Sequence, residues 1–223
     1  MNHQENESPV KKNRKRILFI AQFGVLLAIE TVFCFTVLGS LPIGPIVATL
    51  AGIPVVIAAI LLGTGAGALL GLATGIFSLI IWTFMPPQPP IAFLYTPFYS
   101  LGEIPGNFWS LAISVFPRVM IGVFAGASHS LLSKFLPYQK GRGRDFWAYG
   151  VSGALGSLAN TFFVLGGVYV FFGQQFAEVN QIPYAALMGI IGLTVATNGL
   201  LEAALCAIVA MAVARPVKII LNK

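Results

Sequence analysis

Charged side chains are scarce in this sequence. Only 9% of its 223 residues are charged, whereas 57% are hydrophobic. A soluble domain of this length needs a charged surface, and this composition does not supply one. Beyond the first 16 residues no stretch is polar enough to form a soluble domain. We therefore expect a polar, basic cytoplasmic tail at 1–16 and one integral-membrane domain at 17–223.

Residues that commonly bind metals or carry out catalysis are also few. Cys34 and Cys206 lie in apolar runs, where a thiol behaves as a small hydrophobic group rather than as half of a disulfide. His3 falls in the polar tail, so no metal cluster can be assembled, and neither a metal nor a cofactor is expected. Ser128 and His129 are neighbours, but adjacent side chains on a helix point apart. With no H-E-x-x-H or G-x-S-x-G motif either, the sequence disfavours an enzyme.

Long apolar runs, in contrast, are abundant. A helix needs ~20 apolar residues to cross the hydrocarbon core of a membrane. Because no small-residue cleavage site follows the basic start, we expect the first run to remain as a membrane helix. The sequence predicts an all-α integral-membrane protein with six transmembrane helices, at 17–38, 45–62, 64–85, 109–134, 146–172 and 184–214.

The basic residues predict the orientation of these helices. Cytoplasmic flanks are enriched in Lys and Arg, and six spans place 12 of the 13 on one side. Both termini are therefore expected in the cytoplasm, with the chain in a bacterial cell membrane. A polybasic start beside a membrane helix also indicates contact with anionic lipid rather than nucleic acid. The 12 residues are Lys11, Lys12, Arg14, Lys15, Arg16, Lys134, Lys140, Arg142, Arg144, Arg215, Lys218 and Lys223.

The connection at 86–108, predicted to lie outside, is rich in proline and aromatic residues. It contains the prolines of 86–90 and the run Tyr95-Thr96-Pro97-Phe98-Tyr99, with Glu103 as its only charge. Prolines stiffen a loop, and aromatic side chains give it surface to bury. We expect a structured extracellular loop that caps a substrate site.

Glycine recurs every four residues at Gly63, Gly67, Gly71 and Gly75, which sets these positions in one row on the third helix. Such a row lets a neighbouring helix approach closely. The stretch 63–68 also matches the dinucleotide motif G-x-G-x-x-A, but no strand precedes it and no acidic ribose partner follows. We expect helix packing rather than nucleotide binding.

Small residues also gather on the first helix, at Ala21, Gly24 and Ala28. Small residues at this spacing serve either internal packing or docking to another membrane subunit. The sequence alone leaves both interpretations open.

Three ionisable residues, Glu30, Arg118 and Glu202, fall at membrane depth. A charge there is costly, so each should face the bundle interior or a wet cavity. Arg118 follows Pro117, which frees the carbonyl near Ile113. A guanidinium in such a place suits a carboxylate ligand. The alternative is a structural ion pair between Arg118 and one of the two glutamates.

Amides and hydroxyls are expected to converge on Arg118. Asn198 and Glu202 are four residues apart and share a helix face. Hydrogen bonds between helices are the alternative role for each amide. The full set of candidate substrate-binding residues is Tyr95, Thr96, Asn107, Trp109, Arg118, Asn160, Asn198 and Glu202.

The chain resembles the substrate-binding subunits (S components) of energy-coupling factor (ECF) vitamin transporters, and most closely the pantothenate-specific members. The resemblance runs from about residue 17 to the end. It rests on LPIGP at 41–45, IPVVIAAILLG at 53–63, TPF at 96–98, FPR at 116–118 and NGLLE at 198–202.

The resemblance implies an ECF-type ABC importer subunit that takes a vitamin from outside and lacks its own ATPase. It implies docking, through small residues of the first helix, on a transmembrane coupling subunit (T component) with two cytoplasmic ATPase subunits. Here Gly24-x-x-x-Ala28 is the nearest match to the family's Ala-x-x-x-Ala pattern. Folate, cobalamin or another vitamin, a self-sufficient small-solute permease and an intramembrane enzyme are the alternatives.

Overall fold

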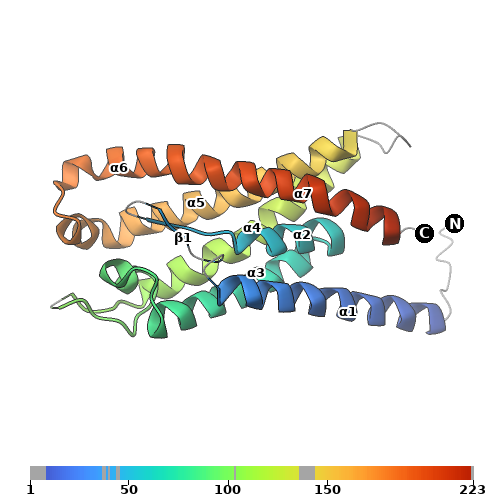
Figure 1. The fold of residues 1–223 in the computed structure, drawn as a ribbon, viewed down its shortest axis with the longest axis horizontal. Helices are drawn as coiled ribbons and strands as arrows, with labels where there is room; N and C mark the ends of the chain where they lie inside the picture. The colour runs from blue at the N-terminus through green and yellow to red at the C-terminus, as the bar shows by residue number, and fades with distance from the viewer. Residues whose placement is uncertain are drawn as a thin grey trace, which may run out of the picture.

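The computed structural model describes residues 9–36, 39, 41–43, 46–102, 104–135 and 144–221, which form an elongated helical bundle (Figure 1). Within these ranges, five helical segments are long and apolar enough to cross a membrane. They are α1 (Pro9–Cys34), α3 (Thr64–Phe84), α4 (Trp109–Phe135), α5 (Arg144–Val179) and a last segment made of η3 (Tyr184–Ala186), α6 (Leu187–Thr194), η4 (Val195–Gly199) and α7 (Leu200–Leu221).

The second predicted span differs from the expectation of a helix over 45–62. Strands β1 (Leu41–Ile43) and β2 (Ile46–Ala48) pair antiparallel, and only then does helix α2 (Gly52–Leu62) begin. Pro54 explains this start, because proline has no backbone N–H and is tolerated in the first turn of a helix but not in its interior. Residues 52–60 of this short helix are all buried, at the centre of the bundle.

The first helix also has different limits from those expected. It begins at Pro9, so residues 9–16 of the predicted tail are helical, and it ends at Cys34. The start of α1, the end of α4, the start of α5 and the end of α7 lie at one end of the bundle (Figure 1). These are the helix ends that carry the basic clusters. Residues 1–8, Glu103, Lys140, Arg142 and Lys223 lie outside the described ranges.

Glycines bring α3 and α4 into backbone contact, as the sequence predicts. A Cβ at Gly71 would overlap the backbone carbonyl of Arg118, and one at Gly75 would lie 2.8 Å from the Cα of Val115. A Cβ at Gly67 would overlap Ala59 of α2. Gly63 departs from this row: it forms the turn between α2 and α3 with a φ of 102°, which glycine adopts without strain.

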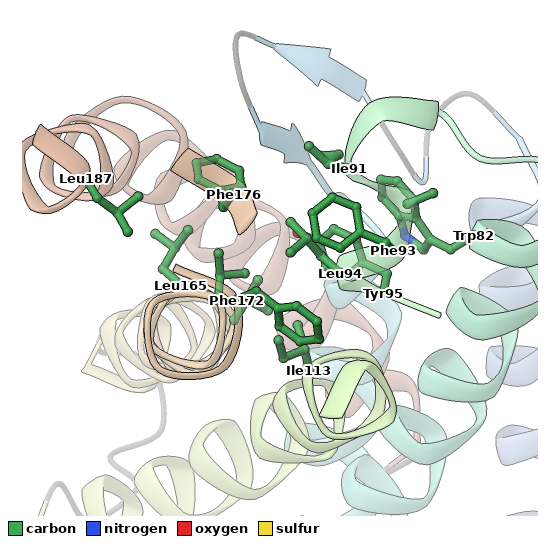
Figure 2. Packing of buried hydrophobic residues seen from close by; sticks show 13 residues of the cluster. Trp82, Ile91, Phe93, Leu94, Tyr95, Ile113, Leu165, Phe172, Phe176 and Leu187 are labelled. Atoms are coloured by element: carbon green, nitrogen blue, oxygen red, sulfur yellow. The ribbon is translucent and has the colours of Figure 1, made fainter. Parts of the chain in front are cut away.

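The proline-rich connection is packed into the bundle. Its short helix η2 (Pro89–Leu94) buries Ile91, Phe93 and Leu94 against α4 and α5 (Figure 2). The hydroxyl of Ser110 donates to the carbonyl of Phe93 over 2.7 Å, and that of Ser114 donates to the carbonyl of Tyr95. These bonds tie the backbone of Phe93 and Tyr95 to α4.

Candidate ligand site

Arg118 is held in the bundle interior by the proline that precedes it. Helix α4 continues through Pro117, whose missing N–H leaves the carbonyl of Ile113 without its helical donor. The Nη1 atom of Arg118 donates to that carbonyl at 3.4 Å. The side chain is only 8% exposed, and its Cζ lies 6.0 Å from the centroid of the Tyr95 ring. The guanidinium therefore has a cation–π partner and further donors available for a ligand.

Two small polar cavities flank Arg118. Thr49, Tyr95 and Arg118 line both of them. One cavity, of about 30 Å³, extends toward α3 and is also lined by Ser78 and Trp82. We call it the α3-side cavity. The other, of about 40 Å³, is lined from α5 and the last helical segment, and we call it the α5-side cavity.

Besides the three shared residues, the α5-side cavity is lined by residues of α5 and of the last helical segment. Asn160 is buried in α5, and its Oδ1 atom has no hydrogen-bond partner. Asn198 lies within η4, a π-helical turn of the kind often found at functional sites. Glu202, at the start of α7, accepts the backbone N–H of Thr49 at 2.7 Å. Arg118, Tyr95, Asn160, Asn198 and Glu202 are thus brought together.

The non-helical entry to α2 contributes to the site through Thr49. Residues 49–51 precede the helix, so some of their backbone groups need partners other than α2; the N–H of Ala51, for example, donates to the hydroxyl of Thr49 at 3.3 Å. Irregular backbone is tolerated at membrane depth only inside the protein or beside a cavity. Binding of the Thr49 N–H by Glu202 satisfies one of these groups. The irregular backbone beside the cavity therefore belongs to the second predicted span, whose helix begins only at Gly52. Helix α4, in contrast, continues without a break through Pro117.

The alternative of a structural ion pair is not realised among the described residues. Glu202 binds the backbone of Thr49, and Arg118 binds the carbonyl of Ile113. Glu30 accepts the hydroxyl of Thr74 at 2.7 Å and the thiol of Cys34 at 3.2 Å, while its Oε2 atom has no partner. Arg118 therefore remains available to an anionic ligand.

Three of the predicted substrate-binding residues lie away from both cavities. The side chain of Asn107 accepts the backbone N–H of Trp109 at 3.2 Å, as at the start of a helix. The indole of Trp109 stacks on Phe171, with 4.3 Å between ring centroids. The hydroxyl of Thr96 shares a 2.7 Å hydrogen bond with that of Thr83. Contact of these residues with a ligand stays a prediction.

The cavity residues that the sequence analysis missed include Thr49, Thr74, Ser78, Trp82 and Thr194. Thr194 precedes Asn198 and Glu202 at intervals of four, a periodicity that could have revealed it. Ser78 is four residues after Thr74 in α3, on the same face. Thr49 binds Glu202 through its backbone, for which side-chain patterns give no signal.

The small residues of α1 separate into two surfaces. A Cβ added at Gly24 would meet nothing within 4 Å, and both Gly24 and Ala28 are exposed. Ala21 instead borders an apolar groove formed with α2 and α7. Helix α1 is the least buried of the five long apolar helices. Internal packing therefore does not explain Gly24.

Comparison with known proteins places this bundle in a transporter family. The model of the family "ECF transporter, substrate-specific component" matches residues 18–214, and the chain belongs to this family. It is thus a non-catalytic transport subunit, which confirms the prediction that it is not an enzyme. Its apolar helices agree with a multi-pass membrane protein.

A curated relative carries a more specific name. The pantothenic acid transporter PanT of Lactococcus lactis subsp. cremoris (strain MG1363) is 28% identical to this chain over 204 residues. The match covers 91% of this chain and 93% of the relative.

Proposed function

We propose that this protein captures pantothenate at the outer face of the bacterial cytoplasmic membrane, with Arg118 binding the carboxylate. The observation that carries the proposal is the buried guanidinium of Arg118, which has no carboxylate partner among the described residues and lines both polar cavities. An unpaired cation at membrane depth is costly, and an anionic ligand offsets that cost. The similarity to a pantothenic acid transporter supports this choice of ligand.

The remaining chemistry of pantothenate matches the site. The molecule has one carboxylate, one amide and two hydroxyls joined by short apolar segments. Asn160, Asn198 and Glu202 offer amide and carboxylate partners for the polar groups. Val164 and Leu165 offer apolar contact in the same cavity. Such a mixture of apolar wall and a few placed polar groups is typical of small-molecule sites.

Loading requires a change in the site. The cavities of about 30 and 40 Å³ each have room for roughly two or three water molecules. A vitamin therefore occupies both at once, after the side chains of Tyr95 and Arg118 move apart. Tyr95 belongs to the segment that follows η2, so the movement involves the connection predicted to cap the site.

The proposal includes partner subunits. A substrate-specific component of an ECF importer docks on a transmembrane coupling subunit with two ATPase subunits. The exposed Gly24 and Ala28 of α1 suit such a contact, because the absence of large side chains lets helix backbones approach closely.

The test is calorimetric titration of the purified chain, in detergent and without partners, with pantothenate, folate, cobalamin, riboflavin, thiamine and biotin. We expect 1:1 binding of pantothenate and no heat from the other five. Binding of a different vitamin would keep the capture role and replace the ligand. Uptake of pantothenate by vesicles that contain this chain alone would contradict the role as a subunit and favour a self-sufficient permease.

A further inference from the structure

The two cavities beside Arg118 differ in the hydrogen-bonding groups they offer. We propose that pantothenate lies across Arg118 in one direction, with its carboxylate in the α3-side cavity against Ser78 and Trp82, and its hydroxyl-bearing end in the α5-side cavity. This inference rests on the proposed function and adds the orientation of the ligand and two residues that select for its carboxylate.

The α3-side cavity presents hydrogen-bond donors. Trp82 lines this cavity, and its indole N–H can only donate. Ser78 differs from its neighbours in α3. The hydroxyl of Thr83 donates to the carbonyl of Leu79, and the hydrogen of Thr74 is shared between Glu30 and the carbonyl of Leu70, whereas Ser78 makes no such bond within the described chain. Together with the guanidinium of Arg118, these groups provide donors for a carboxylate.

Glu30 lies close to this cavity but is not one of its lining residues. The hydroxyl of Thr74 and the thiol of Cys34 both donate to its Oε1 atom, and both of these residues line the cavity. They therefore separate the carboxyl group of Glu30, which is fully buried, from the space where the ligand carboxylate would lie.

The α5-side cavity presents several acceptors beside the amide N–H groups of Asn160 and Asn198. The hydroxyls of Thr161 and Thr194 donate to the carbonyls of Ser157 and Ile190, at 3.4 and 2.9 Å. Because each hydroxyl has one hydrogen, both can only accept a hydrogen bond from a ligand. The Oδ1 atom of Asn160 is buried without a donor. Glu202 adds a carboxyl group. The two hydroxyls and the amide N–H of pantothenate supply the donors that these atoms lack.

The reverse orientation is disfavoured by Glu202. It would bring the ligand carboxylate beside the carboxyl group of Glu202 in a site shielded from water, where like charges repel more strongly than in solvent. It would also leave the hydrogen of Ser78 and the N–H of Trp82 facing ligand hydroxyls instead of a charge, which is a weaker interaction.

The test compares two ligands on matched variants by calorimetry. Pantothenol replaces the carboxylate of pantothenate by a neutral hydroxymethyl group and keeps the rest of the molecule. We expect Ser78→Ala and Trp82→Phe each to weaken pantothenate binding about tenfold or more, because each removes a donor to a charged group. Both variants should change pantothenol binding by less than about threefold. Asn160→Ala should weaken the binding of pantothenate and of pantothenol to the same extent.

Ser128→Ala is the matched control. Its hydroxyl donates to the carbonyls of Phe124 and Ala125 in α4, and the residue lines neither cavity. Ser128→Ala should change neither the affinity for pantothenate nor the affinity for pantothenol. Equal weakening of the two ligands by Ser78→Ala, or selective loss of pantothenate in Asn160→Ala, would overturn the proposed orientation while leaving pantothenate capture intact. Failure of the unmodified chain to bind pantothenate would instead overturn the proposed function.

Discussion

Glu202 and the backbone of Thr49 are joined by a hydrogen bond of 2.7 Å, although they lie 153 positions apart in the sequence. The bond ties the start of α7 to the non-helical entry of α2, and both residues line the cavity beside Arg118. A contact that supports the broken span is therefore also part of the candidate site.

We predict that Glu202→Ala destabilises the protein, because it leaves the part-buried N–H of Thr49 without an acceptor. An unpaired buried donor costs about 1–3 kcal/mol. Glu202→Gln keeps an acceptor oxygen at the same place and should cost less. Thermal unfolding of both variants in detergent measures the difference, and equal midpoints for the two would contradict the structural role of this bond.

The contact between α3 and α4 leads to a prediction for glycine. Gly71→Ala places a methyl group against the backbone of Arg118, and overpacking of this kind typically costs about 1–3 kcal/mol. Gly65→Ala is the matched control in the same helix, because nothing lies within 4 Å of its added Cβ. It should be neutral or slightly stabilising. The midpoints of thermal unfolding should therefore separate the two variants, and a tolerated Gly71→Ala would contradict the close approach.

The proposed docking surface predicts a separation between binding and assembly. Gly24→Trp adds bulk to an exposed position of α1 and should prevent copurification with the coupling subunit and ATPases, without changing pantothenate affinity. Phe19→Trp is a control, since five residues on a helix turn the side chain to about the opposite face. Assembly that survives Gly24→Trp would place the docking contacts elsewhere on the protein.

Much of the architecture could be predicted because lipid imposes simple requirements on a chain. Long apolar runs predicted the five long helical segments, and the four-residue glycine spacing predicted the close approach of a neighbouring helix, which is α4. The second span was misjudged, because hydropathy does not distinguish a helix from a short hairpin followed by half a helix. Pro54 was the available signal, since it restricts where that helix can begin.

The candidate site was predictable where a side chain follows a helical period. Asn198 and Glu202 share a face four residues apart, and the structure brings both to one cavity. Loop residues have no such period, and Asn107 and Trp109 occupy the start of α4 and a stack on Phe171 instead. Thr49 contributes a backbone N–H, which depends on tertiary structure alone.

The central claim is that Arg118 binds the carboxylate of pantothenate. The most direct measurement is calorimetric titration of pantothenate into the unmodified chain and into Arg118→Ala and Arg118→Lys, each shown to be folded by its elution and thermal unfolding. The account predicts 1:1 binding to the unmodified chain and none to Arg118→Ala. Lysine should restore binding only weakly, because it lacks the planar fork that donates two parallel bonds. Unchanged affinity in a folded Arg118→Ala variant would contradict the account.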